Sequence, residues 1–255
     1  MGYMINDNLQ SIGSETAKAG FKNENDIINK FNNWKKDDEA KAWLAIMKYD
    51  LKDIEYVKAE KVRGQFKADI QVQVSIKLKK LISLENIQVK LVRMKRGKNQ
   101  IDKRWVDKYV ELWKISKKVE IILKRFSGEI KPTIKNPRDK RRMFLDEFDK
   151  IDQRELIKFF QKNKILIVND ILRGRDRFSA EWMLVSHNYN NKSKWILKHI
   201  NDVIQFFSDG EIKLSPRKSL YIGKILMQRK GGDGGRASAN MLQFNIDPLK
   251  LFDIE

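Results

Sequence analysis

Three polar residues in the first half of the chain have the types and the spacing of a metal-dependent hydrolytic site. Asp69 is followed nineteen residues later by Gln88, and Lys90 lies two residues further on. Side chains two residues apart point to the same face of a β-strand, so Gln88 and Lys90 share a face if they lie on a strand. Asp69 joins that face if its own strand pairs with this one. Hydrolysis of a phosphodiester needs a divalent cation held by such oxygens and a group that orients the attacking water.

Each of these residues has a role in that chemistry. Asp69 would supply a carboxylate ligand, Gln88 its amide oxygen and Val89 its backbone carbonyl oxygen. Lys90 would orient the attacking water and support the charge that develops on the phosphate. On spacing alone, an ordinary solvated strand face explains the same residues, because Asp, a polar residue and Lys occur at such offsets by chance in many sheets.

The remaining metal-binding residue types narrow the kind of metal site. The chain has no cysteine, which excludes disulfides and thiolate sites. Its two histidines, His187 and His199, are isolated and do not favour a histidine-based zinc site. A metal ion must therefore be held by oxygen.

The surrounding pattern predicts the elements that position these residues. From Asp69 to Ile76, apolar residues alternate with polar ones, which is typical of a half-buried strand. A second strand is predicted from Asn86 to Val92. After a basic turn that contains glycine, apolar residues at helical spacing predict a helix from Gln100 to Ile115.

The rest of the chain predicts a mixed α/β fold with a single mixed central sheet flanked by helices. No linker or repeat separates two domains, so we expect one domain over residues 1–255. Further helices are predicted at 14–34, 39–47, 120–125, 141–148, 153–162 and 201–207, and further strands at 165–169, 182–186, 195–197, 212–214, 221–228 and 241–246.

Charge indicates the class of partner. A formal net charge of +19 favours a polyanion, and nucleic acid is the first candidate. Charge alone does not distinguish an enzyme from a binding module or a merely soluble basic protein. The sequence has neither an apolar span nor a signal-peptide pattern, and its basic residues are not gathered on one amphipathic helix. A soluble cytoplasmic protein with no membrane partner is therefore expected.

Longer strings around the three polar residues resemble one enzyme family. The segment IQVKLV at 87–92 continues into RGKNQIDKRW at 96–105. Both strings are similar to those of HinP-type type II restriction endonucleases. Further similar strings are TAKAGFKNENDI at 16–27, DKRRMF at 139–144, DILRGR at 170–175, AEW at 180–182 and QRKGGDGGRASANMLQFNIDP at 228–248.

The resemblance implies a PD-(D/E)XK nuclease fold, with Gln88 where the second acid usually stands. It implies a Mg²⁺-dependent enzyme that recognises GCGC in double-stranded DNA and cleaves after the first G, leaving two-base 5′ overhangs. The motif residues are then Asp69, Gln88 and Lys90. Glu24 lies in the matching segment of the first helix. It is either a direct or water-mediated metal ligand or a charge that merely favours the helix dipole.

The same comparison indicates where DNA is read. Cations near the second strand would contact phosphates, while amides and Lys103 at the expected helix start could reach base edges in the major groove. A helix cap and a solvated first turn is the alternative. Arg229, Lys230 and Arg236 add charge along a glycine-rich segment, and Asn240 and Gln243 are expected to read bases or phosphates or to have a structural role. The other DNA-binding residues expected are Arg93, Lys95, Arg96, Lys98, Asn99 and Gln100.

One residue departs from the family pattern. The related enzymes carry an aromatic residue between the Gly and the Asn of this loop, and this chain has Lys98. A lysine cannot separate stacked bases by apolar insertion, so the DNA kink is expected to be smaller or to come from another side chain.

Two other functions fit the same chain. A basic nucleic-acid-binding module needs no Asp69, Gln88 and Lys90 set, and a structure-specific repair nuclease would cut branched or damaged DNA instead of a fixed sequence. A restriction enzyme also implies a companion DNA methyltransferase in its host. A palindromic target fits a homodimer as well as a monomer, and the sequence leaves both open.

Overall fold

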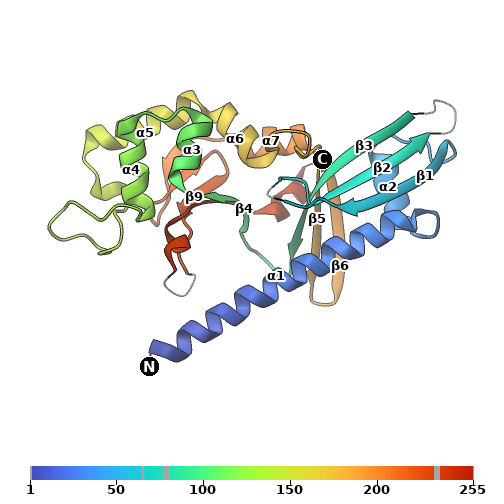
Figure 1. Cartoon of the computed structure of the whole chain (residues 1–255), viewed down its shortest axis with the longest axis horizontal. Coiled ribbons are helices and arrows are strands. Elements are labelled where there is room, and N and C mark those ends of the chain that lie inside the picture. The colour runs from blue at the N-terminus through green and yellow to red at the C-terminus, as the bar shows by residue number, and fades with distance from the viewer. Residues whose placement is uncertain (1, 65, 77–80, 233–235, 255) are drawn as a thin grey trace. The chain divides into compact units, whose positions relative to one another are not determined.

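The computed structural model describes residues 2–64, 66–76, 81–232 and 236–254, and it contains two five-stranded sheets (Figure 1). Sheet A has the strand order β1-β2-β3-β5-β6, and sheet B has the order β4-β10-β9-β8-β7. Each sheet belongs to a separate compact unit. Unit A comprises residues 11–97, 172–203 and 248–255, and unit B comprises residues 1–10, 98–171 and 204–247.

Sheet A is mixed. Its strands are β1 (Ile54–Lys61), β2 (Ile70–Ile76), β3 (Leu81–Val92), β5 (Trp182–Tyr189) and β6 (Lys192–His199). The pairs β1–β2, β2–β3 and β5–β6 are antiparallel, and β3 and β5 are parallel. β3 is the central strand of this sheet, paired with β2 on one side and with β5 on the other.

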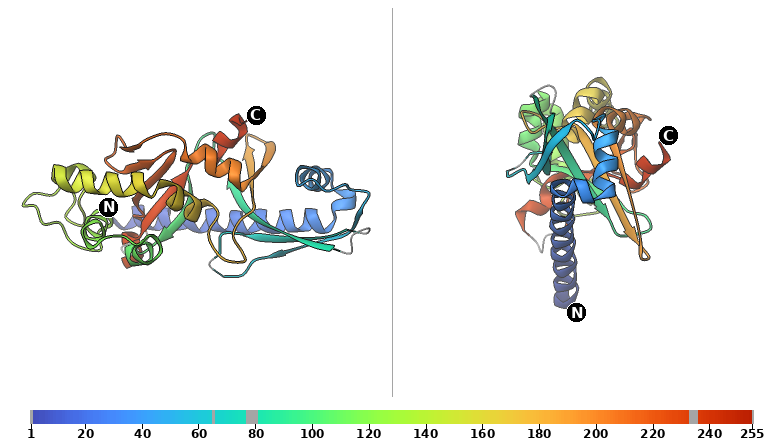
Figure 2. Two further views of the ribbon diagram at one scale, coloured as in Figure 1. Left: turned by 90° about the horizontal axis from the view of Figure 1, so that it is seen from above. Right: turned by 90° about the vertical axis from the view of Figure 1, so that its right-hand side faces the viewer.

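Helices cover the apolar face of sheet A. Within this unit lie residues 11–32 of α1 (Gly2–Asn32), the 3-10 turn Trp34–Lys36, and α2 (Asp38–Ile46), whose N-cap Asp37 accepts a hydrogen bond from the backbone N of Ala40. The part of α1 in this unit runs along β1, β2 and β3 (Figure 2). Ile27 and Phe31 of this helix and Trp43 of α2 belong to one buried cluster with Val72 and Val89 of the sheet. Burial of this apolar area is the main driving force for the unit.

Unit B is an antiparallel sheet packed against helices. Its elements are β4 (Asn99–Arg104), α3 (Val106–Trp113), α4 (Lys117–Ser127), the 3-10 turn Leu145–Glu147, α5 (Lys150–Lys162), α6 (Lys164–Leu172), α7 (Ile200–Ser208), β7 (Ile212–Leu214), β8 (Leu220–Ile222), β9 (Ile225–Arg229), the 3-10 turn Ala237–Asn240 and β10 (Leu242–Ile246). The last residue of α6 and the first four residues of α7 belong to unit A, as does the 3-10 turn Pro248–Asp253. Buried aromatic rings fill the core of unit B: Trp113 lies 4.4 Å from Tyr109 and 5.7 Å from Phe244, between ring centroids.

The predicted α/β class is confirmed, and three expectations about elements are wrong. The strands form two sheets instead of a single central one. The expected helix from Gln100 to Ile115 is strand β4 followed by α3, because residues 99–104 pair with β10. The expected strand at 165–169 lies in α6, where Ile165 is exposed and Ile167 is buried, so only one side of the run faces the core.

Other boundaries follow the sequence more closely. The helix expected at 141–148 is limited to a 3-10 turn, Leu145–Glu147. The expected strand at 221–228 is a tight hairpin of β8 and β9. Among the described residues, no helix combines the length and the hydropathy that a bilayer crossing requires.

A buried ionic network joins β4 to α6 and α3 in unit B. Asp170 is 2% exposed, and its Oδ2 accepts hydrogen bonds from Arg104 Nη1 at 3.2 Å and from Trp113 Nε1 at 2.9 Å. Asp102 accepts from Tyr109 Oη at 2.6 Å and lies 3.4 Å from Arg104 Nη2. The buried carboxylates are thus compensated by both a guanidinium and neutral donors.

We expect Asp170→Ala to lower the free energy of unfolding by about 3 kcal/mol or more, because Arg104 then loses one of its carboxylate partners within a buried network. Urea unfolding followed by circular dichroism measures this change. Glu111→Ala is the control, since Glu111 pairs with Lys108 on the exposed surface of α3, and such a pair contributes about 0.5 kcal/mol. Equal effects of the two substitutions would contradict the assigned role of Asp170.

Candidate active site and nucleic-acid interface

Asp69 is fixed against β3 by its own side chain. It lies directly before β2, and its carboxylate Oδ2 accepts a hydrogen bond from the backbone N of Val89 at 2.7 Å. Its backbone N donates to the carbonyl oxygen of Ile87 at 2.9 Å. The last residue pair of the β2–β3 ladder is Ile70 with Ile87, so the carboxylate takes the place of a ladder acceptor where the strands separate.

Gln88 follows Ile87 on β3, one residue beyond the last pair of the β2–β3 ladder. It is 2% exposed, and in the described part of the chain its side-chain oxygen has no hydrogen-bond partner. A buried amide oxygen without a partner costs about 1–3 kcal/mol, so it calls for an explanation. A cation beside it would satisfy this oxygen.

Lys90 lies two residues further along β3, on the same face as Gln88, and is partly buried. Among the described residues it has no ion-pair partner. Asp69, Gln88 and Lys90 are therefore brought to one end of the β2–β3 pair, as their spacing predicts. This arrangement is a carboxylate, an uncompensated amide oxygen and a free ammonium group.

Glu24 has a partner of its own. Its Oε2 lies 2.5 Å from Nζ of Lys61, and the glutamate side chain is 15% exposed. Lys61 ends β1 and pairs with Ile70, the residue after Asp69. Glu24 is thus tied to the neighbouring strand, and it would have to leave Lys61 to act as a ligand.

The oxygens present suit a hard divalent cation. The described residues hold no group of three His, Cys, Asp or Glu side chains placed to bind a metal. Asp69 and the unpartnered amide oxygen of Gln88 are oxygen donors, which Mg²⁺ prefers, and a backbone carbonyl can complete such a set. The residues therefore fit Mg²⁺ with most of its coordination left to water and substrate.

A polar clamp holds β3 in place beside this site. Asn86 is buried; its backbone N donates to Glu181 Oε2 at 2.9 Å, and its side chain donates to the carbonyl oxygen of Arg177 at 2.9 Å. Gln71 Nε2 on β2 donates to Asn86 Oδ1 at 3.1 Å. Burial raises the pKa of the Glu181 carboxyl above its ordinary value, and the hydrogen bond from Asn86 opposes that shift.

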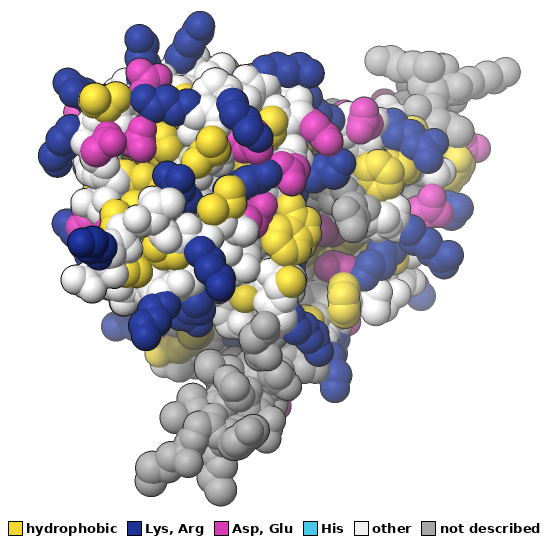
Figure 3. Space-filling view, turned by 60° about the vertical axis from the view of Figure 1, so that its left-hand side comes forward, with side chains coloured by type: hydrophobic (Ala, Val, Ile, Leu, Met, Phe, Trp, Pro, Cys, Tyr) yellow, Lys and Arg dark blue, Asp and Glu magenta, His cyan; other side chains and the backbone are white. Residues whose placement is uncertain are grey.

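The expected DNA-contacting cations of unit A lie in the turn after β3, where Arg93, Lys95 and Arg96 are all exposed. Lys98 begins the next stretch, in unit B. Its Nζ donates to Tyr221 Oη at 2.9 Å and lies 4.9 Å from the centroid of that ring. Many Lys and Arg side chains are spread over the face drawn in Figure 3.

Asn99, Gln100 and Lys103 lie on β4 and not at a helix start, so the geometry expected for them is wrong. Gln100 and Lys103 are exposed and pair with Asn245 and Gln243 of β10. Residues directly opposite each other in a sheet share a face. These side chains would therefore reach DNA from a strand.

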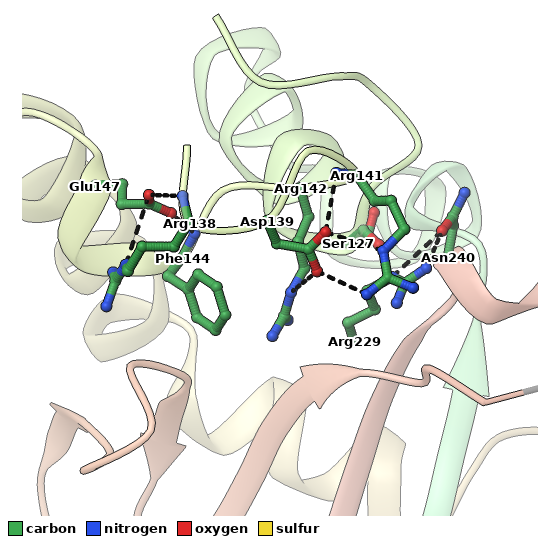
Figure 4. Close-up of polar contacts among 9 residues, drawn as sticks. All are labelled: Ser127, Arg138, Asp139, Arg141, Arg142, Phe144, Glu147, Arg229 and Asn240. Atoms are coloured by element: carbon green, nitrogen blue, oxygen red, sulfur yellow. Dashed lines mark hydrogen bonds and ion pairs between the residues drawn. The ribbon is translucent and has the colours of Figure 1, made fainter. Parts of the chain in front are cut away.

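The cations and amides of the segment after β9 divide into two groups. Arg229 Nη2 donates to Asn240 Oδ1 at 2.7 Å, and its Nε donates to the carbonyl oxygen of Ser127 at 2.9 Å (Figure 4). Arg229 and Asn240 thus bond to each other, and a structural role is the alternative that the sequence left open for Asn240. Arg236 is exposed and Lys230 is partly buried, while residues 233–235 of the same segment lie outside the described residues.

Gln228 and Asn245 lie beside the expected Gln243 and were not singled out from the sequence. Gln228 and Gln243 are opposite each other on β9 and β10, and Gln243 Nε2 donates to Asn245 Oδ1 at 2.8 Å. Asn245 lies two residues after Gln243, so period-two alternation could have found it. Arg142 ends the basic run at 135–142, and its guanidinium carbon lies 4.2 Å from the centroid of the Phe144 ring.

Comparison with known proteins agrees with these observations. A family model described as R.HinP1I restriction endonuclease matches residues 47–252. A crystal structure of restriction endonuclease MspI in complex with its cognate DNA matches with a TM-score of 0.66 and 14% sequence identity, over 92% of each chain. The latter likeness shows the fold alone. No curated protein matches the chain.

We expect Glu181→Gln to become more stable relative to the unsubstituted protein as pH rises. The folded carboxyl has a raised pKa, so its contribution to stability is complete below the unfolded pKa and is lost as pH rises through the folded pKa. Glutamine keeps the acceptor for Asn86 and does not titrate. Urea unfolding at about pH 4 and about pH 8 measures the difference. If the variant instead lost stability relative to the unsubstituted protein between the lower and the higher pH, the raised pKa assigned to the Glu181 carboxyl would be wrong.

Proposed function

Since this chain belongs to the R.HinP1I restriction endonuclease family, we propose that it recognises GCGC in duplex DNA and hydrolyses both strands after the first G. The products carry two-base 5′ overhangs. The observation that carries this proposal is the 2.7 Å hydrogen bond from Val89 N to Asp69, which joins the carboxylate to the strand of Gln88 and Lys90. A binding module without catalysis does not need an unpartnered amide oxygen and an ammonium group beside that carboxylate.

Mg²⁺ is the proposed cofactor. The side chains of Asp69 and Gln88 and the backbone carbonyl of Val89 would hold it, with Glu24 as a further direct or water-mediated ligand once released from Lys61. When bound, Mg²⁺ neutralises charge on the scissile phosphate and lowers the pKa of water. The buried amide oxygen of Gln88, which has no partner among the described residues, supports this assignment.

The protein residues then divide the remaining work. Asp69 is held in position by its hydrogen bond from Val89 N. Lys90 orients the attacking water and supports the negative charge that develops on the phosphate oxygens, and its ammonium is free of competing carboxylates among the described residues. A partly buried position at a strand end limits the access of bulk water to these groups.

DNA contact is proposed for both units. Exposed Arg93, Lys95 and Arg96 would bind phosphates, because such contacts give affinity without reading sequence. Lys103 would contact base edges from β4. DNA as the partner is supported by the fold shared with MspI, whose structure contains its cognate DNA. Further contacts are proposed for Lys98, Asn99, Gln100, Arg229, Lys230, Arg236, Asn240 and Gln243.

The proposed activity has consequences for the host. An enzyme that cuts GCGC in the cytoplasm would cut its host's own DNA, so a companion methyltransferase is expected to protect those sites. The two enzymes need not contact each other. Both a monomer and a homodimer fit a palindromic target.

Digestion of a plasmid of known sequence with Mg²⁺ tests the activity. Discrete fragments whose ends map to GCGC are expected. A ladder with other ends would overturn the specificity, a smear or cutting confined to branched DNA would favour a repair nuclease, and an intact plasmid would favour a binding module.

We expect Asp69→Asn to lower Mg²⁺-dependent cleavage more than about 100-fold while DNA affinity stays within a few fold. Asparagine keeps an acceptor for Val89 N, so melting temperature should change little. Asp38→Asn is the control, because Asp38 is 95% exposed on α2. Cleavage that survives the change at Asp69 would show that the metal site lies elsewhere.

We expect Gln88→Glu to lower the Mg²⁺ concentration for half-maximal cleavage, since a second negative charge strengthens cation binding. Cleavage at saturating Mg²⁺ should fall, because the charge balance around the phosphate changes. Gln73→Glu adds the same charge further along β2 and should leave the metal dependence alone. Equal metal dependence of the Gln88 variant and the unsubstituted enzyme would exclude Gln88 as a ligand.

A further inference from the structure

A large cavity lies wholly within unit B, against one face of sheet B. Its volume is about 1010 Å³. Among the described residues that line it, six are Lys or Arg and none is Asp or Glu. A cavity of this composition suits a polyanion and not a small cation or an apolar ligand.

The floor of the cavity is formed by amide side chains on adjacent strands. Gln228 of β9 and Lys103 of β4 are the two neighbours of Gln243 in the register, so these three side chains form a row across three strands. Gln243 is held by its hydrogen bond to Asn245, and Asn245 is 4% exposed with a side-chain nitrogen that has no partner among the described residues. The floor thus has hydrogen-bonding capacity that the described chain does not use.

The rim carries a guanidinium whose charge is poorly compensated. Arg141 Nε lies 2.9 Å from Asp139, whereas Arg142 Nε lies 3.8 Å from the same carboxylate (Figure 4). Burial lowers the pKa of Arg142, and the neighbouring charge of Arg229 lowers it further. The ring of Phe144 lies 4.2 Å from the guanidinium carbon and holds it in place. An anion beside Arg142 would relieve this repulsion.

Together these features match the two parts of a DNA strand. Arginine binds phosphate through paired N–H donors, and glutamine and asparagine bind base edges through paired donors and acceptors. We propose that the amide floor of Gln228, Gln243 and Asn245 reads base edges of the target, while Arg142 holds a backbone phosphate beside it. This inference rests on the proposed function and assigns sequence reading to sheet B.

Binding to short duplexes tests the floor. Fluorescence anisotropy in Ca²⁺ in place of Mg²⁺ measures affinity for the target and for duplexes with one substituted base pair. Gln228→Leu and Gln243→Leu should each reduce the preference for the target about tenfold, with affinity for unrelated DNA unchanged. An unchanged preference for both variants, with melting temperature retained, overturns the proposal. Gln228→Met gives the same measurement if the leucine variant does not fold.

The phosphate contact has a different signature. Arg142→Gln should weaken binding to all duplexes by a similar factor and reduce the slope of log affinity against log salt by about 1. Arg154→Gln is the matched control, because Arg154 is exposed on α5 outside the cavity. Identical salt slopes for Arg142→Gln and the control would remove Arg142 from the interface.

Failure of the inference can be distinguished from failure of the proposed function. If the unsubstituted enzyme prefers a sequence other than GCGC, only that specificity is wrong, and the preferred sequence serves in the test. An enzyme that prefers no duplex overturns both the specificity and the reading floor. If the unsubstituted enzyme prefers its target and both glutamine variants keep that preference, only the proposed base-reading role of the amide floor is wrong.

Discussion

The hydrogen bond from Val89 N to the carboxylate of Asp69 is the constraint on which the site depends. Where β2 separates from β3, Val89 would otherwise lose its ladder partner. A buried N–H without an acceptor is costly, so the side chain of Asp69 meets a structural need. The same hydrogen bond fixes one oxygen of the Asp69 carboxylate and holds this carboxylate next to the backbone of Val89, the residue after Gln88. One residue therefore completes the sheet and, under the proposed function, supplies a negative charge for the cation.

The surroundings of Gln88 show what this arrangement costs. A nearly fully buried amide oxygen without a partner destabilises the fold by about 1–3 kcal/mol. The apolar cluster around Val89 and the clamp on Asn86 hold the strand despite that cost. Glutamine at this position also avoids a second buried carboxylate, which would require a cation or a proton for stability. Under the proposed function, Gln88 therefore influences both the stability of the metal-free protein and its affinity for the cation.

The alternation and spacing of residues predicted those features of the fold that are determined by residues close together in the sequence. Alternation over residues 69–76 identified β2, and the two-residue spacing placed Gln88 and Lys90 on one face. Strand β4 was mistaken for a helix because Ile101, Trp105 and Tyr109 keep a four-residue spacing across the junction of a strand and a helix. The division of strands between two sheets depends on long-range pairing, such as β10 with β4 and β9, which one-dimensional periodicity does not contain. The role of Arg142 depends on such pairing too.

The path of the chain has a consequence for how such enzymes diversify. Each unit is assembled from segments that alternate along the sequence, so the chain passes repeatedly from one unit to the other. Recombination that exchanges one contiguous gene fragment would therefore transfer neither unit as a whole. New target preferences in this lineage should therefore arise by individual codon changes on exposed strand positions. Transfer of a whole unit by exchange of one gene fragment is not possible for a chain with this order of segments.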